Sequence, residues 1–422
     1  MGKTRTPETG APGPSPRRVL TVLAGATALM MASNSVIFAL LPQLQDRFGF
    51  SSTGLGIIAA SGFAMSFLVQ LLVAPLADKG HPKVLLFTGA FAAVAGNLVC
   101  AGSTGLWMLV GARALTGAAS GCFIPTARAL VSGLGAEGRS ERLGRMASVE
   151  VGGFIVGPVV GGALVGPLGI RWPFVVFCTL AAVAVLVIAT SPLPTLEVQE
   201  NSGRIAIDLL RRRPMVVAVL ISMSLGLPIG MYDALWARYL TDLGARPWLV
   251  GVSLACYSVP FMLLAGVGGR VADRFGPRRT AIRAMFFITP LTVSYALFRN
   301  PWIPILVGIC ESMIQAAAMP ASQSVIANAS PPGRAAGGQG LVGATNVATM
   351  AVVALISSWL YGEYGVRTTF VAVACAAALC AFAAHLVSLP LRGTLGFDPG
   401  EESVAVEPAL GATPTTVLES RS

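Results

Sequence analysis

Long apolar stretches separated by short polar segments run through nearly the whole chain. Each stretch holds about 18 to 25 residues, which is enough for a helix to cross a hydrocarbon core of about 30 Å. Continuous apolar runs, rather than the short alternating segments of a membrane barrel, predict helices. The sequence therefore predicts an all-α integral membrane protein. The twelve predicted spans are residues 19–41, 53–76, 84–103, 105–130, 144–166, 173–191, 214–236, 248–271, 281–299, 301–328, 338–360 and 367–390.

The twelve spans group into two predicted bundles of six transmembrane helices. The segment between the bundles carries four arginines, and the end of the chain is rich in Glu, Pro, Thr and Ser, a composition typical of disorder. The predicted organisation is a cytoplasmic leader (1–18), a first bundle (19–191), a cytoplasmic linker (192–213), a second bundle (214–390) and a disordered cytoplasmic tail (391–422).

Composition and charge agree with a membrane protein whose termini are cytoplasmic. Apolar residues make up 54% of the chain and charged residues 11%, with a mean hydropathy of +0.73. The net charge of +10 would suggest nucleic acid in a soluble protein, but its placement matters more here. Of the 29 Lys and Arg, 22 fall on the side that holds both termini, 6 on the other, and Arg113 within a span. The positive-inside rule thus predicts a multi-pass inner (plasma) membrane protein without a nucleic-acid partner.

Cysteine and histidine usage predicts neither a metal site nor a cofactor. The seven cysteines all lie inside predicted spans, are odd in number and form no C-x-x-C pair, so we interpret them as small hydrophobic residues. The two histidines, His81 and His385, are far apart in the sequence and suggest no metal cluster.

The second half of the chain repeats the first at a spacing of 195 residues. Six helices per half is an even number, so both halves enter the membrane from the same side and are parallel repeats. Transporters with such repeats place the substrate site near the midplane between the halves. The alternative interpretation is that the repeat is an old duplication whose only present role is helix packing. Matching pairs include Gly49 with Gly244, Gly56 with Gly251, Asp78 with Asp273 and Pro125 with Pro320, while Gly169 and Gly365 match at 196.

Two loops at equivalent positions carry the strongest local motif. Residues 269–279 read GRVADRFGPRR and resemble the G-x-x-x-D-R-x-G-R-R loop of the major facilitator superfamily, with Pro277 in place of the first base. Residues 74–83 read APLADKGHPK and depart from it, since Ala74 replaces the opening Gly and His81 the later one. The resemblance implies the major facilitator fold and a conformational latch, whereas the simpler alternative is a solvated, positive loop. The implied latch residues are Asp78, Lys79, Asp273, Arg274 and Arg278.

The fourth and fifth spans hold two further motifs of this family. Arg113 followed by Gly117 resembles its R-x-x-Q-G motif, although Thr116 replaces Gln. An Arg within a span needs a partner. Its role is either proton coupling, as the resemblance implies, or a structural one in which it only bonds backbone carbonyls. In the fifth span the small residues resemble the G-x-x-x-G-P-x-x-G-G motif of the antiporters, which implies export. Its glycines clear one helix face for a neighbouring backbone. The matching residues are Gly153, Gly157, Pro158, Gly161 and Gly162.

Three carboxylates inside predicted spans are candidates for proton carriers. They are Glu150, Asp233 and Glu311, and each could instead be a satisfied structural acid. A low-dielectric cavity disfavours the charged form of a carboxyl group, so such a group can take up and release protons. Gln315 and Ser322 share the helix face of Glu311 and predict a polar stripe beside a cavity.

Aromatic and thioether side chains near these acids suggest a hydrophobic substrate, because such groups accept varied apolar surfaces. Most of them could simply face lipid or core. The candidate cavity residues are Asn34, Tyr232, Trp236, Tyr257, Phe261 and Gln315, with Met313 and Met350 beside them.

These features predict a secondary transporter, not an enzyme, that acts by alternating access. The leading hypothesis is a monomeric, proton-coupled antiporter that exports a small hydrophobic organic compound such as a drug or metabolite. A proton symporter that imports a nutrient is the alternative. A membrane enzyme or sensor is a remote third, because the sequence shows no catalytic His or Cys pair and no GxxxxGK[ST] nucleotide loop.

Overall fold

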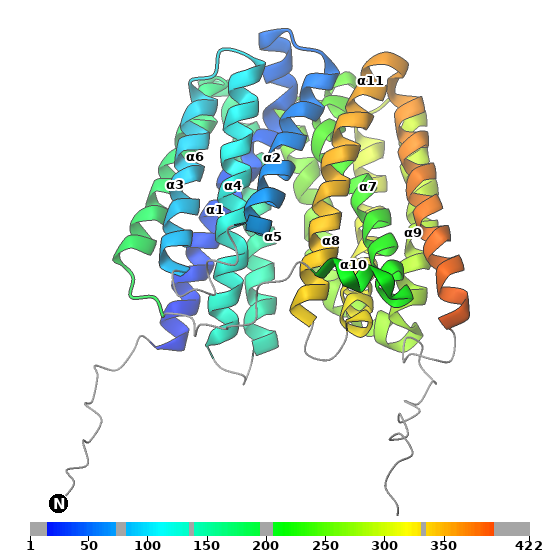
Figure 1. Ribbon diagram of the computed structural model, residues 1–422. Helices are drawn as coiled ribbons and strands as arrows, with labels where there is room; N and C mark the ends of the chain where they lie inside the picture. Colours follow the sequence, from blue (N-terminus) through cyan, green and yellow to red (C-terminus); the bar gives the residue numbers. More distant parts are fainter. Residues whose placement is uncertain (1–14, 73–81, 135–138, 195–205, 331–334, 392–422) are drawn as a thin grey trace, which may run out of the picture.

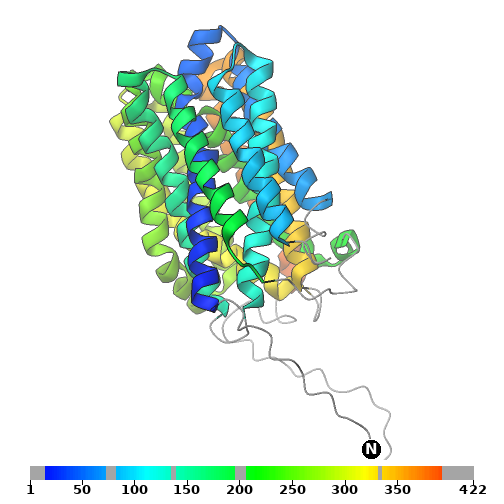
Figure 2. The same ribbon diagram turned by 90° about the vertical axis from the view of Figure 1, so that its left-hand side faces the viewer.

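The chain folds into a bundle of long helices that run between the same two ends. The structure, a computed structural model, describes residues 15–72, 82–134, 139–194, 206–330 and 335–391, and these ranges contain helices and turns without strands. Figures 1 and 2 show the bundle from two sides. We call the end where the first helix begins the lower end and the opposite end the upper end, as in Figure 1.

The helices form two groups that follow one another in the sequence. The first group contains α1 (Pro16–Phe48), α2 (Ser52–Leu72), α3 (Pro82–Ala101), α4 (Leu106–Gly133), α5 (Arg139–Leu168) and α6 (Arg171–Thr190). The second contains the 3-10 helix η2 (Ala206–Arg211), α7 (Arg213–Asp242), α8 (Pro247–Phe275), α9 (Pro277–Ser294), η3 (Tyr295–Leu297), α10 (Trp302–Ala329), α11 (Ala335–Ser388) and η4 (Leu389–Leu391).

The last element, α11, supplies two membrane crossings. Its 54 residues are interrupted at Gly365, whose φ of 76° and ψ of −177° are not helical. Figure 1 shows the two legs of α11 meeting at the upper end. Eleven long helices in the described residues are apolar enough to span a membrane, and the break in α11 divides the last into the two predicted spans 338–360 and 367–390. The all-α membrane fold is therefore confirmed.

Several predicted helix ends differ from the observed ones. The predicted leader and first span meet at residue 19, but α1 already begins at Pro16, because proline fits the first turn of a helix. The ninth span was predicted to reach 299, yet α9 ends at Ser294 and the chain turns through η3. The predicted linker 192–213 contains η2, whose Leu209 is buried in the same apolar cluster as Met215 of α7. Part of the linker and the tail beyond 391 lie outside the described residues.

The repeat is visible in the backbone of both groups. Gly49 ends α1 with a φ of 68°, and its equivalent Gly244 follows α7 with a φ of 88°. Gly169 and Gly365 form the second matching pair, with φ values of 85° and 76°. These left-handed conformations are costly for residues with a Cβ atom, so glycine sets the same turns in each half.

Basic residues at equivalent positions also tie equivalent helices together at the lower end. Lys83 of α3 donates hydrogen bonds to the carbonyl oxygens of Ala189 and Ser191, which end α6, at 2.9 and 3.0 Å. Its equivalent, Arg278 of α9, donates to the carbonyl oxygen of Ser388 at the end of α11, at 3.0 Å. All three bonds satisfy carbonyl groups left open at a helix C-terminus.

The two groups contact each other through glycines in their upper parts. A Cβ atom on Gly56 of α2 would lie 2.5 Å from the carbonyl oxygen of Ala354 in α11. At the equivalent position, a Cβ on Gly251 of α8 would overlap the carbonyl group of Pro158 in α5. The two interfaces, α2 with α11 and α5 with α8, therefore use the same glycine-on-backbone contact.

A similar contact fixes α2 against α4 within the first group. A Cβ atom on Gly117 would overlap the carbonyl group of Gly62, so the two backbones can approach only because both residues lack side chains. Close backbone approach replaces the hydrophobic driving force that is absent between helices in lipid.

We predict that Gly117→Ala destabilises the bundle, because the added methyl group would force α2 and α4 apart. Overpacking of this kind costs about 1–3 kcal/mol and should lower the melting temperature in detergent by several degrees. Gly111→Ala is the matched control on α4, since a Cβ there meets nothing within 4 Å. Equal melting temperatures for the two variants would contradict the prediction.

Candidate functional site

Glu311 lies at the centre of a buried polar cluster in the second group. Its carboxylate is fully buried on α10. The hydroxyl of Tyr295 donates to it at 2.6 Å and that of Tyr232 at 3.0 Å, and the Tyr232 hydroxyl also lies 3.2 Å from Thr292 Oγ1. Hydroxyl groups from α7 and η3 thus satisfy the carboxyl group of this acid, as a buried carboxyl group requires.

Aromatic rings form the wall of this cluster. The ring of Tyr232 lies 6.0 Å from that of Tyr295 and 5.7 Å from that of Trp236, both in edge contacts. Trp236 is fixed by a hydrogen bond from its indole nitrogen to Ser253 Oγ of α8, at 2.9 Å. Edge-to-face packing of this kind is favourable for aromatic pairs. Phe261, also predicted to line a cavity, is half-buried on α8.

Gln315 belongs to the same cluster and is nearly fully buried. It accepts a hydrogen bond from the hydroxyl of Tyr257 on α8. The predicted polar stripe of Glu311, Gln315 and Ser322 is thus buried along its length and faces neighbouring helices. Met313, on the same helix, points away and is 50% exposed.

The structure identifies the partner that Arg113 needs inside the first group. Arg113 of α4 is buried and donates to Asn34 Oδ1 of α1 at 2.6 Å. Its guanidinium also lies 4.7 Å from the ring centre of Phe38, a cation–π contact, and 3.3 Å from Thr116 Oγ1. Gly62 makes room for it, because a Cβ there would meet Arg113 Nε at 2.6 Å.

Arg113 also interacts electrostatically with a residue of the second group. Arg113 and the carboxylate of Asp233 on α7 attract each other electrostatically, although they form no direct ion pair among the described contacts. Asp233 is half-buried and directly follows Tyr232, which bonds Glu311. Asp233 and Arg113 therefore lie near each other across the interface of the two groups, and the Glu311 cluster lies next to Asp233 within the second group.

Glu150 occupies a different place from the other two acids. Its carboxylate forms a two-pronged ion pair with Arg128 of α4, with Nε and Oε1 2.8 Å apart. Both residues lie within the first group, on neighbouring helices. A bidentate arginine pair of this kind fixes the relative orientation of the two side chains.

The predicted latch residues are described only in the second loop, since Asp78 and Lys79 lie outside the described residues. Asp273 and Arg274 are exposed at the lower end of α8, and the Arg274 guanidinium lies 5.6 Å from the ring centre of Phe275. Arg278 is buried and bonds the end of α11 within its own group.

The glycine motif of α5 serves two neighbours. Gly153, Gly157 and Gly161 face α1, where a Cβ on Gly153 would lie 2.6 Å from the carbonyl oxygen of Ala28. Gly162 faces the second group instead, since its Cβ would lie 2.6 Å from the carbonyl oxygen of Pro247 in α8. The motif thus allows α5 to pack against both its own group and the other.

A cavity of about 640 Å³ opens between α1 and α5 of the first group, and neither Glu311 nor Asp233 lines it. It lies in the lower halves of these helices and is mostly apolar. Among the described residues, no group of three His, Cys, Asp or Glu side chains could hold a metal ion. The residues that line the cavity are Leu20, Thr21, Ala24, Gly25, Ala28, Arg145, Ser148 and Val149.

Tyr295 and Arg128 were not among the predicted site residues, yet each binds one of the predicted acids. Tyr295 lies at a helix end, and no pattern in the sequence connects it with Glu311. Arg128 was counted as a cytoplasmic base, although its position inside the predicted fourth span was a signal that it needs a partner.

We predict that Arg113 and Asp233 are energetically coupled. Arg113→Gln or Asp233→Asn alone leaves the other charge uncompensated and should cost on the order of 2 kcal/mol, less than for a fully buried pair because Asp233 is half-buried. The double variant should recover much of the lost thermal stability, as a double-mutant cycle in detergent would show. Arg171→Gln, an exposed arginine on α6, is the control. Fully additive losses would argue against the coupling.

Comparison with known proteins identifies the family. Residues 23–232 and 218–418 each match the model of the Major Facilitator Superfamily. The multidrug resistance protein MdtG of Salmonella paratyphi C (strain RKS4594) is 24% identical over 325 residues, which cover 74% of this chain and 80% of MdtG.

Solved transporter structures share the fold. A bacterial homologue of the human lysosomal transporter Spinster, crystallised in an inward-facing and unoccupied conformation, matches with a TM-score of 0.75 and 15% identity over 90% of this chain and 98% of its own. The nucleoside transporter NupG matches with a TM-score of 0.72 and 15% identity, over 87% of this chain and 98% of its own. With matches to the family model in both helix groups and this shared fold, the chain belongs to the Major Facilitator Superfamily of membrane transporters.

Proposed function

We propose that the chain is a proton-coupled antiporter that exports a small, hydrophobic organic compound. The observation that carries this proposal is a pair of charges at the interface of the helix groups, Asp233 of the second group near Arg113 of the first, beside the buried Glu311 cluster of the second group. The aromatic rings around them suit an apolar substrate. Similarity to MdtG, a multidrug resistance protein, and the antiporter-like glycine motif of α5 support export.

The distribution of positive charge supports a cytoplasmic lower end. Most Lys and Arg residues lie on the side where α1 and α7 begin, and the positive-inside rule places that side in the cytoplasm. The upper end is then the outer side. Because the glycine contacts between the groups lie in their upper parts, the structure corresponds to a state closed to the outside.

In the proposed cycle, the two acids exchange protons for substrate. Protons from the outer side neutralise Asp233 and Glu311, which weakens the attraction between Asp233 and Arg113 and releases the substrate outward. Deprotonation toward the cytoplasm restores the charged site for the next substrate. In this scheme a single copy of the chain carries out the whole cycle.

The energy available is adequate for this exchange. Each proton that enters down a potential of 100 mV supplies about 2.3 kcal/mol, which corresponds to a concentration ratio of roughly fifty-fold for the exported compound. No ATP is needed in this scheme.

The direction of transport is tested by deleting and overexpressing the gene and measuring intracellular accumulation across a panel of hydrophobic compounds. We expect at least one compound to accumulate in the deletion strain and to be depleted by overexpression, and an uncoupler should abolish the depletion. An unchanged accumulation of every compound, or proton-driven uptake in vesicles, would count against export.

Glu311→Gln tests the coupling role. The amide keeps the size and some hydrogen bonding of the acid but cannot release a proton at cellular pH, so we expect substrate binding to persist and substrate-driven proton flux in proteoliposomes to be lost. Glu363→Gln, an exposed acid at the upper end, is the control and should retain flux. Wild-type flux in Glu311→Gln would remove this residue from the coupling role.

A further inference from the structure

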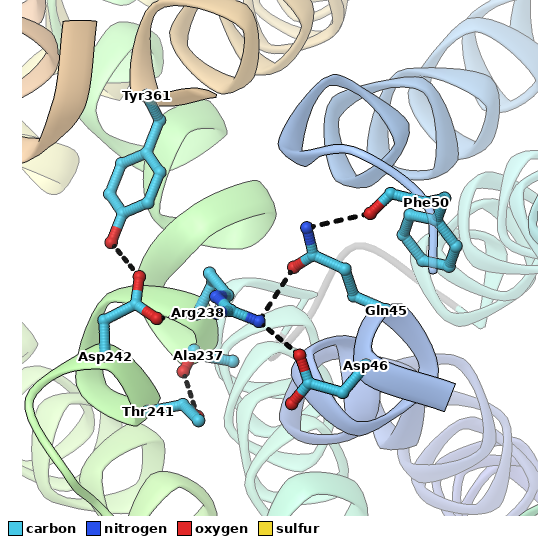
Figure 3. A network of polar contacts seen from close by, with 8 residues as sticks. All are labelled: Gln45, Asp46, Phe50, Ala237, Arg238, Thr241, Asp242 and Tyr361. Atoms are coloured by element: carbon cyan, nitrogen blue, oxygen red, sulfur yellow. Dashed lines mark hydrogen bonds and ion pairs between the residues drawn. The ribbon is translucent and has the colours of Figure 1, made fainter. Parts of the chain in front are cut away.

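A network of charged residues connects the two helix groups at the upper end. Arg238 of α7 donates from Nη1 to Asp46 Oδ1 of α1 at 2.6 Å and to Gln45 Oε1 at 3.3 Å. Its Nη2 pairs with Asp242 Oδ1 at 2.8 Å, one turn further along α7. Figure 3 shows the guanidinium lying between the ends of α1 and α7.

The remaining partners hold each side of this link in position. The hydroxyl of Tyr361, on the first leg of α11, donates to Asp242 Oδ2 at 2.6 Å. On the other side, Gln45 donates from Nε2 to the carbonyl oxygen of Phe50, in the turn between α1 and α2, at 3.1 Å (Figure 3). Contacts within the second group thus orient Arg238, and a contact within the first group orients its acceptor Gln45. The ion pair between Arg238 and Asp46 therefore joins two groups whose side chains are already held in position.

The network lies beside close packing between the groups. Ser358 of α11 is fully buried next to Gly56 of α2, and Gly362 lies against Ser52, where a Cβ would be 3.4 Å from Ser52 Cβ. The ion pair and this packing therefore close the same end of the molecule.

The exposure of the network suits a contact that breaks and re-forms. The side chains of Asp46 and Arg238 are 60% and 24% exposed, so water and salt screen their attraction. Arg238 also shares α7 with Asp233, five residues earlier. One rigid helix thus carries both charged contacts to the first group, one at midheight and one at the outer end.

We propose that Arg238 is the positioning residue of an outer latch, which holds the two groups together by binding Asp46 and must release it before the site opens to the outside. The inference rests on the proposed transport function and orientation. No step in it requires a particular substrate.

The latch is tested by the accessibility of a cysteine placed in the closed interface. Ser358→Cys in the full-length protein is labelled from outside with a membrane-impermeant maleimide, and its labelled peptide is quantified by mass spectrometry. Surface ion pairs of this kind shift an equilibrium by about two- to fivefold, so Arg238→Gln and Asp46→Asn should each raise the labelling rate by that factor. Arg238→Lys, which keeps the charge, should restore a rate near that of the parent.

Two controls separate a latch from a structural defect. Arg47→Gln and Arg246→Gln remove exposed arginines at the same end and should leave labelling unchanged. Rising salt should speed labelling of the parent but not of Arg238→Gln, because only the parent has the ion pair to screen. Unchanged labelling in Arg238→Gln and Asp46→Asn, or equal effects of the control substitutions, would overturn the proposal.

A second reporter covers the case in which Ser358→Cys does not fold. Ser52→Cys with Gly362→Cys should form a disulfide, because the 3.4 Å between the Cβ positions is close to disulfide geometry. The cross-link should stop transport until it is reduced, and retained transport in the cross-linked protein would overturn a latch at this end. If Arg238→Gln and Asp46→Asn raise the labelling rate as expected but the protein exports no compound, the proposed function is refuted and the latch is not.

Discussion

The membrane interior supplies no water to satisfy buried polar groups, so each charge buried in this bundle depends on a partner within the protein. Arg113 binds Asn34 and lies over Phe38, Glu150 pairs with Arg128, and Glu311 accepts from two tyrosine hydroxyls. The positions of α1, α4, α7 and α10 follow from these pairings as much as from apolar packing. A charge that changes its protonation state therefore changes the contacts between helices.

Glycine determines how closely those helices can approach. Gly56 and Gly251 bring equivalent helices of the two halves onto the backbone of the other group, and Gly162 adds a third contact of the same kind. Lipid provides no hydrophobic force that drives helices together, so these contacts depend on complementary shape. Few strong bonds would have to break for the helices to separate. The ionic contact of Arg238 with Asp46 adds a charged contact at the upper end of the same interface.

Much of the fold was predictable because membrane helices depend on local sequence. Apolar length gave the spans, and the 195-residue register paired Gly49 with Gly244, which adopt the same left-handed turn. The sequence also indicated Arg113, Asp233 and Glu311 as charges that require partners. It could not indicate that the hydroxyl of Tyr295 contacts Glu311, because hydroxyl groups are common in membrane helices and the direction in which they point depends on helix rotation.

The sequence by itself determined the membrane class, the spans, the repeat and the family, because hydropathy, spacing and loop motifs are properties of contiguous residues. Only the tertiary structure decided that Glu150 pairs with Arg128, that Asp233 lies near Arg113, and that Arg238 reaches Asp46. Each of these contacts joins different helices, and two of them join the two halves. A partner across a helix interface is set by how the helices pack and rotate, which no local pattern in the chain records.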